Sequence, residues 1–184
     1  MGRVLEVIDK SARDFIAAQR MFFVATAPLG ADGHLNLSPK GPADTFAVLD
    51  EHTVAYLDLT GSGAETAAHL RENGRITLMF CAFEGAPNIL RLYGVGRLVI
   101  AEMPEYATLS QHFPDRSGAR AVVVVAVSRV ATSCGFSVPY YDYTGDRELA
   151  EAWAQARTPE RMRTYRNEKN AVSIDGLAAF EPTR

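Results

Sequence analysis

Residues 75–100, RITLMFCAFEGAPNILRLYGVGRLVI, contain two strand-like runs joined by a short turn. The run at 75–83 is almost continuously apolar, and the run at 89–100 is long enough for an extended strand. Gly94 and Gly96 lie inside the second run, which indicates a bulge, a sharp bend or a ligand close to the backbone. The stretch therefore predicts an antiparallel hairpin with a bend in its second strand.

Similar runs lie on both sides of this hairpin. Further strands are expected at 21–27, 34–38, 46–49, 53–59 and 119–130. The alternation at 34–38 favours a half-buried strand paired with 21–27. Helices are expected at 11–19 with Ser11 as the N-cap, and at 62–73, 104–113, 147–155 and 159–170. Six or more strands with few helices between them favour an antiparallel barrel over a doubly wound parallel sheet.

The bulk composition limits the class of protein. The 184 residues suit one domain, and we expect 1–184 to form it, with a helical C-terminal extension from about residue 133. The net charge of -3 supplies no basic field, so we expect no nucleic-acid or membrane partner. Two distant cysteines and the absence of a signal-peptide core favour a cytoplasmic protein. The four histidines lack metal-ligand spacing, so no metal site is expected.

Two strand ends carry groups suited to binding an anion. The first, LSPKG at 37–41, contains Ser38 and Lys40, whose charge can reach a phosphate. The second, YLDLTGSG at 56–63, offers the Thr60 and Ser62 hydroxyls before a helix whose first N–H groups are unpaired. The alternatives are a solvated lysine and a serine that only caps the helix.

Other candidates are less specific. Arg91 lies on the long strand near the glycines, where it either faces a ligand or stands on an exposed face. Tyr140, Tyr141 and Tyr143 either stack on a planar ligand or pack against a subunit partner. No Gly-x-Ser-x-Gly elbow is present, which disfavours a hydrolase.

Taken together, the stretches 21–40, 53–70, 75–83 and 89–98 resemble the pyridoxamine 5'-phosphate oxidase-like family of flavin-binding split barrels. The resemblance implies a mainly β, antiparallel six-stranded split barrel with peripheral helices, and a homodimer with two FMN sites at the subunit interface. It places Lys40 near the flavin phosphate or ring, and Arg91 on a neighbouring strand that addresses the ring. The full expected set for FMN is Ser38, Lys40, Asp58, Leu59, Thr60, Ser62, Gly63 and Arg91.

The chain departs from the family pattern at three places. Gly63 and Ala64 stand where a basic pair commonly binds the phosphate. Leu35 and Asn36 stand where an arginine usually opens the Lys40 strand. The C-terminal substrate signature of true pyridoxamine phosphate oxidases is also missing. The resemblance therefore implies an FMN-dependent oxidoreductase acting on a small molecule that the sequence does not identify, with no catalytic residue assigned. The alternatives are a deazaflavin-dependent reductase, a non-catalytic binder of flavin or another small molecule, a haem protein, or a protein without cofactor.

Overall fold

The strands of the computed structural model, which describes residues 2–182, form one antiparallel sheet. The strand order is β3-β2-β6-β7-β8-β5-β4. The additional strand β1 pairs with β8. The strands are β1 (Val4–Leu5), β2 (Phe22–Thr26), β3 (Asn36–Lys40), β4 (Phe46–Val48), β5 (Thr53–Leu59), β6 (Arg75–Cys81), β7 (Ile89–Ile100) and β8 (Ala119–Ser133). The expectation of a mainly β, antiparallel split barrel is confirmed, although the described residues form eight strands rather than six.

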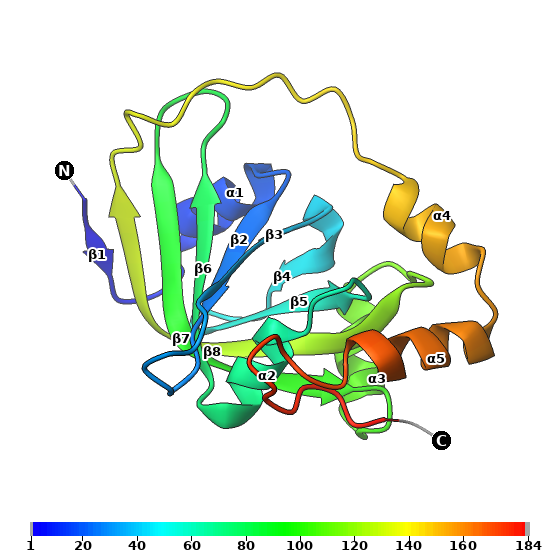
Figure 1. Cartoon of the computed structure of the whole chain (residues 1–184). Helices are drawn as coiled ribbons and strands as arrows, with labels where there is room; N and C mark the ends of the chain where they lie inside the picture. Colours follow the sequence, from blue (N-terminus) through cyan, green and yellow to red (C-terminus); the bar gives the residue numbers. More distant parts are fainter. Residues whose placement is uncertain (1, 183–184) are drawn as a thin grey trace.

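The bend that curls this sheet lies in β7, as the glycines predict. The register between β7 and β8 shifts between Tyr93 and Gly94. A Cβ atom on Gly94 would collide with the carbonyl oxygen of Ala126, so only glycine allows the two strands to approach this closely. Figure 1 shows the consequence: β7 and β8 turn as they run, and the sheet wraps around its own core.

The barrel interior is filled by aromatic and branched side chains. Phe22 lies with its ring centroid 5.0 Å from that of Phe46, 5.4 Å from Tyr56 and 5.6 Å from Phe80. Burial of each such ring stabilises the fold by about 1.5–3 kcal/mol. Helix α1 (Lys10–Ala18) contributes Ile16 to the same core. Its N-cap is Asp9, which accepts a hydrogen bond from the Ala12 N–H, so the prediction of Ser11 as N-cap is wrong by two residues.

Helix α2 (Glu65–Glu72) follows β5 and begins three residues later than expected. Its N-cap residue is Ala64, which offers no side-chain hydrogen bond, so Ser62 does not cap the helix. Small residues on α2 pack against the end of the chain, where Ala67 and Ala68 lie in a buried cluster with Ala179. The C-terminal segment is thereby held against α2.

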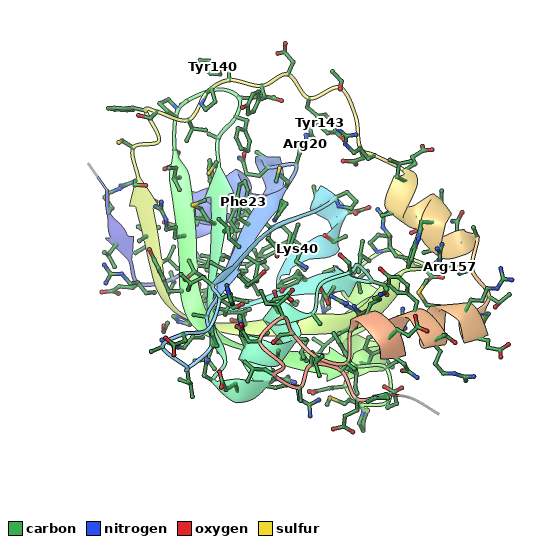
Figure 2. The ribbon with its side chains drawn as sticks, in the orientation of Figure 1. Arg20, Phe23, Lys40, Tyr140, Tyr143 and Arg157 are labelled. Atoms are coloured by element: carbon green, nitrogen blue, oxygen red, sulfur yellow. The ribbon has the colours of Figure 1, made fainter. Side chains whose placement is uncertain are left out.

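The chain after β8 crosses the top of the molecule as an extended segment and then forms two helices (Figure 1). These are α4 (Leu149–Gln155) and α5 (Pro159–Lys169), and they meet through Trp153 and Tyr165, whose ring centroids are 4.9 Å apart. In the extended segment Tyr143 lies beside Arg20, with the guanidinium 4.8 Å from the ring centroid (Figure 2). Between β7 and β8 lie the short helix α3 (Tyr106–Leu109) and a 3-10 turn (Ser110–His112). None of the helices within residues 2–182 has the length and apolar character needed to cross a membrane.

Candidate functional site

Edge strand β3 turns its polar side chains inward. The Asn36 amide donates to Thr26 Oγ1 at 3.2 Å and to Thr66 Oγ1 on α2 at 3.0 Å, and Ser38 donates to Asn36 at 2.7 Å. Lys40 points the same way, towards β5, whereas Leu35 and Leu37 face solvent with 81% and 68% of their surface exposed. The polar side chains of the strand thus share the inner face of the sheet, and Leu37, with Leu35 just before the strand, lies on the outer face.

A buried charge cluster joins β3, β5 and β8. The Asp58 carboxylate accepts from Lys40 Nζ at 3.0 Å and from Arg120 Nε at 2.7 Å. Burial alone would raise the pKa of Asp58, but the charges of Lys40 and Arg120 outweigh it and lower the pKa to about 2. The carboxylate is therefore ionised at neutral pH, with a cation on each side.

The turn from β5 to α2 is held by residues from other parts of the chain. Thr60 Oγ1 donates to the Gly118 carbonyl at 2.8 Å and accepts from Arg166 Nε at 3.0 Å. The Asn170 side chain donates to the Gly61 carbonyl at 2.9 Å. The Gly63 carbonyl accepts from Arg120 at 3.0 Å. The hydroxyl of Thr60 is consequently engaged within the protein.

Of the eight residues expected at the cofactor site, Thr60 lies in the turn just described, and the other seven fall into four groups. Ser38, Lys40 and Asp58 share the inner face of the barrel. Leu59 follows a bulge in β5 and packs on the opposite side, against the cluster around Leu57. Ser62 and Gly63 lie exposed on the turn, and Arg91 pairs in register with Met79 and donates to Ser133 at 3.0 Å. Since Met79 is opposite Phe23, next to the inward Phe22, Arg91 belongs to the outer face of the sheet.

Sequence reasoning missed three residues that border this site, namely Arg120, Arg166 and Asn170. A single charge at the start of the valine-rich run 119–130 was the available signal for Arg120. Arg166 and Asn170 come from α5 and its C-cap and lie more than 100 residues from their partners in β5 and the turn after it, so no local pattern marks them.

The residues present fit the ring of a flavin but not its phosphate. The inward row of Asn36, Ser38 and Lys40 offers the donors and acceptors that an isoalloxazine edge needs. The turn before α2 instead presents the Glu65 carboxylate, which accepts from the Ile174 N–H at 3.4 Å, and the nearby Lys40 is already paired with Asp58. A phosphate placed at this turn would meet a carboxylate where the family commonly has basic residues.

Within residues 2–182, His, Cys, Asp and Glu side chains form no group of three that could hold a metal ion.

Comparison with known proteins agrees with this architecture. Residues 8–134 match the family model described as pyridoxamine 5'-phosphate oxidase. The Pyridoxamine 5'-phosphate oxidase family protein ustO of Aspergillus flavus is 46% identical over 149 residues, which cover 79% of this chain and 59% of that protein. The crystal structure of HupZ from Group A Streptococcus is 24% identical with a TM-score of 0.52, covering 67% of this chain and 91% of that one. A second crystal structure, of a HupZ variant with one substitution, gives a TM-score of 0.54, with 68% and 99% covered.

The family match extends over more than half of the chain, so the chain belongs to the pyridoxamine 5'-phosphate oxidase family. The alignment spans only 59% of the length of the Aspergillus relative. The HupZ structures share the fold.

Proposed function

We propose that the protein is an FMN-binding oxidoreductase acting on a small molecule. The observation that carries the proposal is the inward polar row of β3 beside the Lys40–Asp58–Arg120 cluster, in a chain that belongs to this family. When bound, the flavin would supply hydride and electron transfer. The chain's own residues would orient it: Asn36 and Ser38 by hydrogen bonds, and Lys40 by its positive charge at the end of the strand.

The proposal includes a homodimer formed through the outer face of the sheet. Leu35, Leu37 and Pro39 lie exposed on that face, and Phe23 and Met79 continue it at neighbouring register positions. A contiguous apolar surface of this kind favours a protein partner. Arg91 lies on the same face, so it would reach a flavin only at the edge of such an interface. Leu37→Glu should give a monomer in sedimentation equilibrium, whereas a wild-type monomer would remove both the dimer and the role of Arg91.

Titration of the purified chain with FMN tests the cofactor. We expect the absorbance of FMN to change and its fluorescence to be quenched on binding. The affinity should be reduced, because the turn lacks the basic pair that commonly binds the phosphate. Lys40→Met should weaken FMN at least about threefold, while Lys10→Met, which removes an exposed lysine of α1, should leave it unchanged. If neither the absorbance nor the fluorescence of FMN changes when it is mixed with the protein, the proposal fails.

Two other functions use the same site. A deazaflavin coenzyme shares the ring and would use the same β3 groups; a preference of more than tenfold, about 1.4 kcal/mol, in parallel titrations would identify it. A non-catalytic protein that binds flavin or another small molecule is favoured by two observations. The Thr60 hydroxyl is already hydrogen-bonded within the protein, and the basic pair is missing. Tight stoichiometric binding without turnover by any reductant and acceptor would support that function over the oxidoreductase.

We also propose a cytoplasmic location. Cys81 is buried and Cys134 exposed, and both thiols are free, as expected in a reducing compartment. Reaction of both cysteines of the unfolded chain with a thiol reagent, immediately after extraction from cells, would test their redox state.

A further inference from the structure

A cavity of about 650 Å³ lies where α4 and α5 pack over the ends of β7 and β8. Its volume is in the range of small-molecule sites. Four of its lining residues are arginines, Arg120, Arg157, Arg163 and Arg166, against the two carboxylates of Glu102 and Glu181. None of the eight residues expected to bind the flavin lines it. Figure 2 labels one of the lining arginines, Arg157, near α4 and α5.

The buried side of the cavity has polar atoms without partners. The Arg120 side chain is only 6% exposed. Its Nε donates to Asp58 and its Nη2 to the Gly63 carbonyl, and its Nη1 has no partner among the described residues. Asn170, also in the lining, is fully buried, and its Oδ1 finds no partner in the part of the chain that the structure describes. A buried guanidinium with an unused N–H costs free energy unless something in the cavity accepts from it.

The second guanidinium, that of Arg166, adds to this positive charge. Within residues 2–182, Arg166 donates to two neutral oxygens, those of Thr60 and the Ala119 carbonyl. Burial and the charge of Arg120 lower its pKa, so the two cations oppose each other. Asp58 is the carboxylate bonded to Arg120, and it is shared with Lys40. An anion in the cavity would relieve this repulsion.

Part of the remaining lining is apolar. Met162 and Ala154 are buried there, and the Phe180 ring lies under the Arg120 guanidinium at 4.9 Å. A lining that combines arginines with a thioether, a methyl group and an aromatic ring suits a molecule with an anionic head and an apolar body. The α5 arginines and Phe180 lie beyond residue 134, outside the part that matches the family model.

We propose that this cavity is a second binding site, which adjoins the proposed flavin site at Arg120, for a small organic anion whose carboxylate or phosphate is held by Arg120 and Arg166.

Calorimetric titration of the purified chain with phenyl phosphate and with benzoate tests the proposal, with benzyl alcohol as the neutral probe. We expect at least one anion to bind with Kd below about 1 mM and the alcohol not to bind, and the better anion identifies the head group. Arg166→Gln should weaken binding about tenfold. Because Arg166 also holds Thr60, Arg163→Gln is the second variant: its side chain is exposed at the cavity, and about a threefold loss is expected.

Arg161→Gln is the matched control, since Arg161 is exposed on the same helix but does not line the cavity. It removes the same charge and should leave the affinity unchanged. No binding of either anion, or equal losses in Arg163→Gln and Arg161→Gln, would overturn the proposal. Displacement of bound FMN by phenyl phosphate would overturn the claim that the cavity is a second site, while leaving the flavin proposal intact.

Discussion

Asp58→Asn tests whether the buried charge cluster holds the strand ends together. The substitution keeps the shape of the side chain and removes the charge between two cations. An asparagine also places an N–H donor towards either Lys40 or Arg120, which are themselves donors. Breaking a buried ion pair on one side costs about 3–5 kcal/mol, so we expect a loss of that size in the free energy of unfolding at pH 7.

The pH dependence of unfolding gives a second estimate of how much the ionised Asp58 stabilises the fold. The pKa of Asp58 falls from 3.8 to about 2 on folding, and that difference corresponds to about 2 kcal/mol of stability. Because the folded pKa is the lower one, this stability is complete above pH 3.8 and is lost as the pH falls towards 2. The gap between wild type and Asp58→Asn should therefore be about 1 kcal/mol smaller at pH 3 than at pH 7.

Urea unfolding followed by circular dichroism at both pH values measures the gap. Asp44→Asn is the control, because Asp44 pairs with Arg116 at the surface and is 52% exposed; it should cost no more than about 1 kcal/mol. Arg120 is 6% exposed and Lys40 21%, so adding Arg120→Met to Asp58→Asn should restore more stability than adding Lys40→Met. A loss below about 1 kcal/mol in Asp58→Asn, or a gap independent of pH, would refute this account.

Four further outcomes follow from single contacts. Thr60→Val removes a hydroxyl that bonds the Gly118 carbonyl and Arg166, so the free energy of unfolding should fall by about 1–3 kcal/mol in urea titrations, and an unchanged midpoint would contradict this. Gly94→Ala would press a Cβ against a backbone oxygen and should cost more than about 2 kcal/mol, measured by thermal unfolding. Trp153→Ala removes the contact with Tyr165 and should expose α4 to early proteolysis, whereas Trp153→Phe should protect it. Burial lowers the pKa of His69, so its ring should titrate below 6.5 by NMR, and stability should fall as the pH drops below 6.5; a normal titration would show that the ring is solvated.

The hairpin of β6 and β7 shows how far the sequence pattern reaches. Its apolar runs predict β7 over the residues where it occurs, and Gly94 predicts the bend, because apolar periodicity and glycine sterics are local properties. The two-residue β1 was not predicted because it depends only on pairing with β8. The start of α2 was expected three residues too early, at Ser62, because the turn before the helix is shaped by the distant Arg120 and Asn170.

The candidate site was predictable only in its chemistry. The sequence indicated that Lys40, Asp58 and Thr60 stand at strand ends, and their residue types suggested an anionic or planar ligand. It did not show that Asp58 neutralises Lys40, or that Arg91 lies on the other face of the sheet, because both depend on which strands become neighbours.

Patterns along the chain were enough to define the class of fold, through alternating and continuous apolar runs, and the family, through stretches spread along residues 8–134. The tertiary structure decides which charged side chains become neighbours. Arg120, Arg166 and Asn170 gather around the turn before α2 only because α5 packs over the end of β8. Electrostatic and hydrogen-bond energies depend on distance in space and not along the chain, so the cationic cavity behind the predicted strand ends appears only in the folded protein.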